Sequence, residues 1–119
     1  EANTPESMRT VAGILLNRLA IGMPLQADAT IEYVLEDPLH ELPPGQLAVA
    51  LREVESPYNT YKNLGLPPTP IANPGRQALA AILNPVKSDY LYYITGRDGD
   101  FYYATTYAQH QRNIETHLR

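Results

Sequence analysis

The segment of residues 56–75, SPYNTYKNLGLPPTPIANPG, places the strongest limit on the fold of this chain. It contains five prolines, two glycines and three asparagines. Because proline has a fixed φ and no backbone N–H, neither a helix nor a central strand can run through the segment. A compact domain seldom carries so long an irregular stretch unless it lines a site. Its apolar anchors, which are Tyr58, Tyr61, Leu64, Leu66 and Ile71, favour an ordered loop over a disordered one.

The composition narrows the class of protein. With 119 residues, 44% of them hydrophobic and 18% charged, the chain is expected to form one soluble globular domain over residues 1–119. A net charge of −4 without a basic run argues against a nucleic-acid partner. The absence of cysteine excludes thiolate metal sites, and the three histidines lack zinc-ligand spacing, so we predict no metal. No apolar run reaches a membrane-spanning length. Because the chain opens on Glu1 rather than Met, we expect a fragment of a longer protein or a processed product.

The secondary-structure pattern is that of an α+β protein. Helices are predicted at about 5–20, 29–36, 45–54 and 75–83, and a last helix runs from Thr106 to the end. Residues 89–95 and 101–106 read as strands, joined through the hairpin signal Asp98-Gly99. We therefore expect several short helices around a long Pro-rich loop, with a C-terminal β-hairpin followed by a helix.

Periodicity also predicts which residues face the core. Thr4 is expected to cap the first helix and Gly22 to end it. The apolar stripe of the first helix comprises Met8, Val11, Ala12, Leu15, Leu16 and Leu19. In the last helix one face comprises Tyr107, His110, Gln111, Ile114 and Leu118.

Aromatic usage is dominated by nine tyrosines, with one phenylalanine and no tryptophan. Tyrosine suits a polar groove that receives a sugar or a peptide, and it also suits a sheet with tyrosines on both faces. For the hairpin residues Tyr90, Tyr92, Tyr93, Tyr102 and Tyr103 we favour the two-faced sheet.

Polar residues gather just after the first helix. Asn17, Arg18, Gln26, Asp28 and Thr30 lie where the chain turns sharply, and such groups can line a cleft. Taken singly, each is more often structural: Asp28 or Thr30 can cap the next helix, and Asn59 and Asn73 can each satisfy loop backbone in an Asx-turn. What the motifs offer is carboxylates, amides and tyrosines, which suit acid–base chemistry on a polyhydroxyl substrate.

Four ordered blocks carry a resemblance that covers nearly the whole chain. They are NRL.IGMPLQ.D.T (17–30), SPYNTY..GLPP.PI.NPG (56–75), LNP....DYLYY (83–93) and T...H (106–110). In these blocks the chain resembles the catalytic domain of the YceG-like family, which are membrane-anchored endolytic murein transglycosylases. It departs from the family pattern at Ala29, where proline is usual, and at residues 32–35, where a stretch with glycine is more common.

The resemblance implies a reaction and a site. The reaction is cleavage of peptidoglycan strands between N-acetylmuramic acid and N-acetylglucosamine, on the outer side of the cytoplasmic membrane, without a cofactor. Glu1 aligns with the second glutamate of the family's catalytic motif, so the catalytic acid is either Glu1 or the glutamate before it. The implied substrate-binding residues are Gln26, Asp28, Tyr58, Asn59, Tyr61 and Asn73.

The resemblance also implies binding partners, and two alternative functions remain open. Expected partners are glycan strands and cell-wall synthesis enzymes, with membrane attachment only through an anchor outside this chain. One rival is a glycan-binding module without turnover, and the other is a hydrolase that uses Asp28 as a second carboxylate. We expect Asp28 instead to brace the cleft by accepting hydrogen bonds from backbone amides around Thr30.

Overall fold

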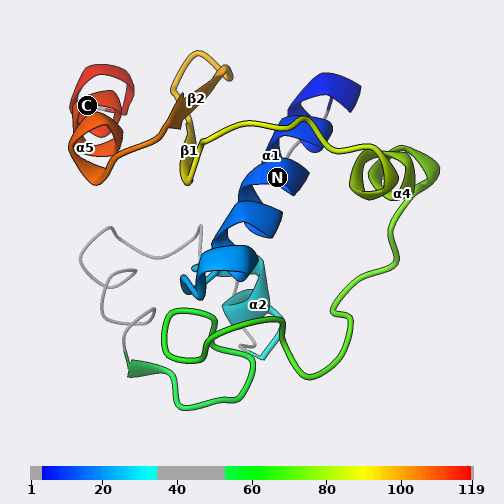
Figure 1. Ribbon diagram of the computed structural model, residues 1–119. Helices are drawn as coiled ribbons and strands as arrows, with labels where there is room; N and C mark the ends of the chain where they lie inside the picture. Colours follow the sequence, from blue (N-terminus) through cyan, green and yellow to red (C-terminus); the bar gives the residue numbers. More distant parts are fainter. Residues whose placement is uncertain (1–3, 35–52, 119) are drawn as a thin grey trace. The chain divides into compact units, whose positions relative to one another are not determined.

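A computed structural model describes residues 4–34 and 53–118 (Figure 1). The chain divides into two compact units, Glu1–Arg18 with Pro74–Arg119, and Leu19–Asn73. The elements in order are α1 (Pro5–Ile21), α2 (Asp28–Glu32), α4 (Arg76–Leu83), β1 (Tyr92–Thr95), β2 (Phe101–Ala104) and α5 (Tyr107–His117). The predicted α+β class, with a C-terminal hairpin followed by a helix, is confirmed. The helix predicted at 45–54 lies almost wholly outside the described residues.

Helix α1 begins and ends where the sequence predicts. The Thr4 hydroxyl accepts a hydrogen bond from the backbone N–H of Ser7 at 3.1 Å, and the Ser7 hydroxyl accepts one from the backbone N–H of Thr4 at 3.2 Å. This reciprocal pair is a capping box with serine in place of the usual glutamate. Gly22 follows the helix with a φ of +72°, a conformation that costs glycine little.

An extended segment, residues 84–91, lies along α1 and is held by the helix's polar side chains. Arg9 Nε donates to the carbonyl of Asn84 at 2.7 Å, and the backbone N–H of Val86 donates to the carbonyl of Arg9 at 3.0 Å. About two turns further along the helix, Asn17 Nδ2 donates to the carbonyls of Ser88 and Tyr90, each at 2.9 Å. These bonds satisfy carbonyls that a lone extended strand would leave unpaired.

The buried face of α1 differs from the predicted apolar stripe. The buried residues are Ser7, Thr10, Val11, Gly13, Ile14 and Arg18. Of the predicted stripe only Val11 is buried, and Leu16 is 39% exposed. The prediction was wrong because the face that segment 84–91 covers needs hydrogen-bond donors and clearance for a backbone, and apolar periodicity records neither.

The hairpin forms as predicted and sorts its rings onto two faces. Strands β1 and β2 are antiparallel, with Tyr93 opposite Tyr103 and Ile94 opposite Tyr102. Gly99 adopts a φ of +85° in the connecting turn. Because side chains alternate along a strand, Tyr102 lies on the α5 side, where its ring stacks on His117, while Tyr103 lies on the other. The two-faced arrangement of tyrosines is confirmed.

Helix α5 packs on the hairpin through histidines. Thr106 caps the helix by accepting from the backbone N–H of Gln109 at 3.2 Å. His110 stacks on Tyr92 at a centroid distance of 5.0 Å, and the Arg18 guanidinium lies 5.3 Å from the centre of the same ring. The predicted stripe is only partly right, because Tyr107 is 57% exposed.

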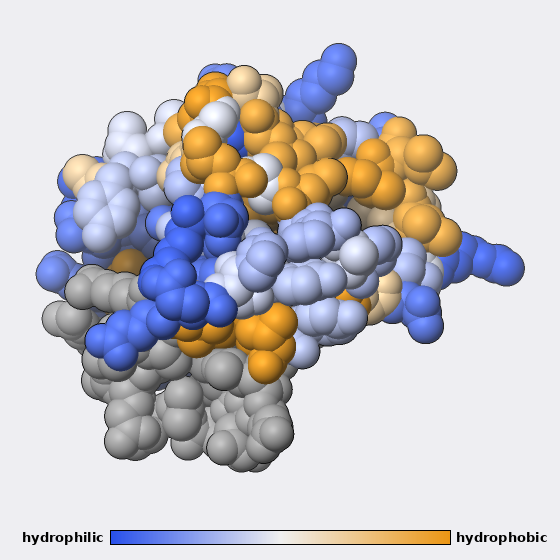
Figure 2. All heavy atoms as spheres, turned by 90° about the horizontal axis from the view of Figure 1, so that it is seen from below, coloured by the Kyte–Doolittle hydropathy of each residue, from blue (hydrophilic) through white to orange (hydrophobic). Residues whose placement is uncertain are grey.

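The second unit and α4 complete the described part. Helix α2 is shorter than predicted, and α4 matches its prediction, ending at Leu83 with Asn84 as its C-cap. Residues 53–73 form the irregular loop that the prolines predict. Apolar atoms gather in patches on the face drawn in Figure 2, and the large exposed apolar side chains include Leu79, Ile82 and Leu83 of α4. No helix among the described residues is both long and apolar enough to cross a membrane.

The contact between α1 and segment 84–91 predicts the sign of a mutational effect. A Cβ added at Gly13 would lie 2.1 Å from the carbonyl oxygen of Val86. In a solvent-exposed helix Gly→Ala would stabilise by about 1 kcal/mol. Gly13→Ala should instead destabilise by about 1–3 kcal/mol, because the backbone of residue 86 must move away. Urea unfolding measures the change, and a stabilised variant would show that the segment does not lie on α1.

His110 predicts a pH dependence of stability. Its Nδ1 is buried and has no hydrogen-bond partner within residues 4–34 and 53–118, and burial, followed by the charge of Arg18, lowers the pKa of His110. The unfolded chain therefore takes up this proton at higher pH than the folded one. Stability from His110 is complete above pH of about 6.5 and is lost as the pH falls through the folded-state pKa. Melting temperatures between pH 5 and 7.5 should rise with pH, and His110→Phe should flatten that rise; equal slopes would contradict the assignment.

Candidate functional site

The two blocks that hold most predicted site residues meet within the unit Leu19–Asn73. The backbone N–H of Gln26 donates to the carbonyl of Thr60 at 3.3 Å, and that of Ala27 donates to Thr60 Oγ1 at 2.9 Å. The hydroxyls of Thr30 and Thr60 lie 3.0 Å apart, and both residues are buried. Residues 26–30 are thus fastened to the Pro-rich loop through Thr60, a residue that the sequence analysis did not single out.

Asp28 braces the loop, but not as a helix cap. The N-cap of α2 is Ala27, without a side-chain cap, and Thr30 donates its hydroxyl back to the carbonyl of Ala27 at 2.7 Å. Asp28 Oδ1 instead accepts the hydroxyl of Tyr61 at 2.8 Å. The expectation that Asp28 accepts from backbone amides near Thr30 was therefore wrong. Two predicted site residues are joined by this bond, and a carboxylate that accepts it is held in one orientation.

Asn59 is an internal brace of the loop. It has no exposed surface. Its Nδ2 donates to the carbonyl of Val54 at 2.8 Å, and its Oδ1 accepts the backbone N–H of Tyr61 at 2.9 Å. The second bond is the Asx-turn that the sequence allows. Because no atom of Asn59 reaches solvent, its expected contact with a sugar would require the loop to rearrange. Its hydrogen bond to Tyr61 requires no rearrangement.

Three further predicted site residues lie toward solvent. Gln26 is exposed and has a φ of +52°, the one positive φ at a non-glycine residue in the described part of the chain. Such a conformation costs about 1–3 kcal/mol and is often found at functional sites. Tyr58 is half-buried, its hydroxyl lies 2.7 Å from that of Thr69, and its ring packs on Tyr33. Asn73 is exposed.

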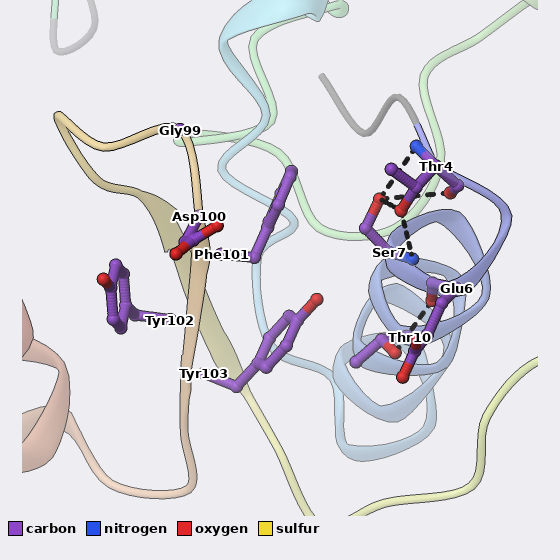
Figure 3. A pocket seen from close by; sticks show the side chains of 9 residues that line it. All are labelled: Thr4, Glu6, Ser7, Thr10, Gly99, Asp100, Phe101, Tyr102 and Tyr103. Carbon is purple, nitrogen blue, oxygen red and sulfur yellow. Dashed lines mark hydrogen bonds between the residues drawn. The ribbon is translucent and has the colours of Figure 1, made fainter.

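Glu1 lies outside the described residues, three positions before Thr4. The described start of α1 faces β2 across a hollow of about 380 Å³, here called the α1–β2 hollow (Figure 3). Its lining residues are Thr4, Glu6, Ser7, Thr10, Gly99, Asp100, Phe101, Tyr102 and Tyr103. In Figure 3 the rings of Phe101 and Tyr103 point toward α1, and that of Tyr102 points away. The sequence analysis placed these rings in a sheet but did not predict the hollow. The alternation of side chains along β2 would have shown that Phe101 and Tyr103 share a face, but only the structure shows that α1 lies opposite that face.

The electrostatics near the hairpin are set by short-range contacts. Tyr102 donates its hydroxyl to Asp98, which raises the pKa of Tyr102 to about 12 and lowers the pKa of Asp98. Burial raises the pKa of Tyr103, and a hydrogen bond with Thr10 opposes that rise. No group of metal-binding side chains occurs among the described residues. Tyr102 and Tyr103 are therefore uncharged and Asp98 is ionised near neutral pH, which suits a polar, neutral ligand better than an anionic one.

Comparison with known proteins places the chain in a family. The sequence profile of the YceG-like family matches residues 1–116. Among similar proteins, the endolytic murein transglycosylase of Bacillus subtilis strain 168 is 36% identical over 118 residues, and that of Streptococcus pneumoniae strain D39 is 34% identical over 119. The crystal structure of a YceG-like protein from Listeria monocytogenes superposes with a TM-score of 0.77 at 38% identity over 94% of this chain.

The chain belongs to the YceG-like family. Each curated match covers 99% of this chain, but the chain spans only 31% of the Bacillus protein and 22% of the Streptococcus one. It also spans 34% of the Listeria protein. The family assignment therefore applies to nearly the whole of the chain, which corresponds to between 22% and 34% of these relatives.

The two bonds of Asn59 predict a structural cost. Asn59→Ala leaves the Val54 carbonyl and the Tyr61 N–H without their side-chain partner, so unfolding should become easier by roughly 1–3 kcal/mol. Asn73→Ala, an exposed asparagine at the end of the same unit, is the matched control and should change stability by about 0.5 kcal/mol or less. Thermal and urea unfolding of both variants decide the matter, and a wild-type melting curve for Asn59→Ala would refute the brace.

Proposed function

We propose that this chain is the catalytic portion of an endolytic lytic transglycosylase. It cleaves the bond between N-acetylmuramic acid and N-acetylglucosamine in peptidoglycan strands and leaves a 1,6-anhydro-N-acetylmuramic acid end. The observation that supports this best is the family match over residues 1–116, together with relatives named endolytic murein transglycosylase at 34–36% identity.

The proposed chemistry needs one carboxyl group. The acid protonates the glycosidic oxygen as the bond from that oxygen to the anomeric carbon breaks. The resulting carboxylate then takes the proton of the muramic acid 6-hydroxyl, and the oxygen of that hydroxyl forms a bond to the anomeric carbon. No water is consumed, and the carboxyl group ends in its starting state. Glu1, or the glutamate preceding it in the family motif, has this role.

The loop contacts support Asp28 as a positioning residue rather than a second catalytic carboxylate. Its Oδ1 is engaged by the Tyr61 hydroxyl at 2.8 Å. A nucleophilic carboxylate must be free to approach the anomeric carbon. A carboxylate that positions the substrate works best when its orientation is fixed. Gln26, Tyr58, Tyr61 and Asn73 are proposed to contact the glycan with it, and Asn59 to act by holding the loop in place.

A stiff loop also reduces the entropic cost of binding. The five prolines of residues 56–75 restrict the backbone before any ligand arrives, and the buried Asn59 and Thr60 fix its centre. We propose that residues 1–119 act as one domain at the C-terminal end of a longer, membrane-anchored protein on the outer side of the cytoplasmic membrane. Glycan strands are its substrate and cell-wall synthesis enzymes its partners.

The mass of the product tests the reaction class. Digestion of purified glycan strands by the full-length protein should yield 1,6-anhydro ends, which are lighter by one water than the reducing ends a hydrolase makes. A product that has gained water would favour the paired-carboxylate hydrolase. Binding without any product would favour the glycan-binding module.

Two substitutions in the full-length protein test the single-carboxyl mechanism. Asp28→Asn keeps an oxygen that can accept from Tyr61, so it should retain most activity and the anhydro product. Glu1→Gln, and the same change at the preceding motif glutamate, should be tested in parallel, because an amide cannot donate the proton. The variant that removes the acid should slow cleavage by about 10²–10⁴-fold. Loss of cleavage in a folded Asp28→Asn protein would overturn the mechanism.

A further inference from the structure

The hairpin face opposite α5 carries a row of nearly parallel aromatic rings. Phe101 and Tyr103 have ring centroids 6.2 Å apart and planes 18° apart. Tyr103 continues to Tyr90 at 5.3 Å and 21°, and Phe101 to Tyr93 at 6.4 Å and 30°. These rings are half-buried or exposed rather than enclosed in a core. Such a row presents a broad apolar surface made of ring faces and edges.

The wall opposite these rings is polar. In its first turns α1 places Ser7 and Thr10 on the buried face, whereas Val11 and Ile14 hold the corresponding positions further along. The hydroxyl of Ser7 is bonded to Thr4, and Thr10 donates its hydroxyl to the carbonyl of Glu6 at 3.0 Å and is hydrogen-bonded with Tyr103. The lining therefore offers a ligand acceptors mainly through the carboxylates of Glu6 and Asp100. If this wall served only to pack against the rings, apolar side chains would fill it. Instead a hollow of about 380 Å³ stays open, within the usual size of small-ligand pockets, roughly 300–1,000 Å³.

An apolar platform facing polar groups fits a pyranose ring. A sugar in the chair form has a face of C–H groups that packs on aromatic rings, and a rim of hydroxyl and acetamido groups that needs hydrogen-bond partners. Peptides and lipids lack this division between a flat apolar face and a polar rim. The hollow therefore matches the shape and polarity of a single sugar unit.

The charge of the hollow distinguishes between the two sugars of the glycan. Glu6 and Asp100 belong to its lining, and its described residues include no lysine or arginine. N-acetylmuramic acid carries a lactyl carboxylate wherever its peptide is absent, and two nearby carboxylates would repel it. N-acetylglucosamine is neutral and meets no such repulsion.

We infer that the α1–β2 hollow is a subsite for the N-acetylglucosamine unit of a glycan strand, with Phe101 and Tyr103 as its stacking platform. The inference rests on the proposed function for the identity of the polymer. The hollow lies at the start of α1, which follows the family's catalytic motif by only a few residues, so a sugar bound there belongs to the strand on which the motif acts.

The test uses the full-length protein and the tetramer of N-acetylglucosamine as a neutral probe. Calorimetric titration should show that Phe101→Leu, which keeps apolar volume but removes the ring, weakens tetramer binding at least fivefold. Tyr107→Leu is the matched control, because it removes an exposed ring of α5 outside the hollow and should leave binding within twofold. For glycan strands, Phe101→Leu should raise KM while kcat stays within about twofold. Tetramer affinity in Phe101→Leu equal to wild type, or no binding by the wild type, would overturn the subsite.

A second measurement keeps the test decisive if Phe101→Leu fails to fold. Hydrogen exchange of the wild-type protein should show that the tetramer protects amides in residues 4–10 and 99–104, and protection confined to other segments would overturn the subsite. The proposed reaction fails separately. If glycan strands bind through Phe101 but no anhydro product forms, the subsite stands and the transglycosylase activity is refuted. If anhydro product forms and Phe101→Leu leaves KM unchanged, the transglycosylase activity stands and the subsite is refuted.

Discussion

The hydrogen bonds by which α1 holds segment 84–91 are the interaction on which the unit Glu1–Arg18 with Pro74–Arg119 depends. Side chains of Arg9, Asn17 and Arg18 donate to backbone carbonyls from Asn84 to Leu91, and Gly13 lets the backbone at Val86 approach the helix. The segment needs these donors because it has no strand partner over most of its length. Its last residues lead into β1, so the same contacts set where the hairpin begins. The family-like blocks NRL and LNP....DYLYY are thus two halves of one contact.

Buried polar groups have a similar role in the unit Leu19–Asn73. A loop rich in proline and glycine cannot satisfy its backbone groups through regular ladders, so side chains supply the partners. Asn59 serves the loop itself, Thr60 joins the loop to residues 26–30, and Tyr61 binds Asp28. Three consecutive residues therefore turn an irregular segment into a defined surface. The strained backbone conformation of Gln26 occurs where the chain is held by the hydrogen bond from the Gln26 N–H to the carbonyl of Thr60 and by the contacts of the residues that follow.

Each unit uses side-chain hydrogen bonds to fix an irregular segment before any ligand is bound. Preorganisation of this kind is what a glycan-cleaving enzyme requires, because the strand must be held in register before one acid can act. The α1–β2 hollow joins aromatic rings to a polar helix wall, and this pairing is the basis of the proposed sugar subsite.

The sequence by itself determined the local elements: the caps at Thr4 and Gly22, the hairpin at Asp98-Gly99, the helix at about 75–83 and the irregular loop. Each depends on conformational preferences of a few neighbouring residues, which hold wherever the chain folds. It also determined the family and most candidate residues, through four ordered blocks. Only the tertiary structure decided that α1 buries Ser7, Thr10 and Arg18, that Asp28 binds Tyr61 rather than a helix end, and that Phe101 and Tyr103 border a hollow. Those outcomes depend on which backbone N–H and C=O groups of distant segments lie nearby and require hydrogen-bond partners. The spacing of apolar residues in the sequence does not contain that information.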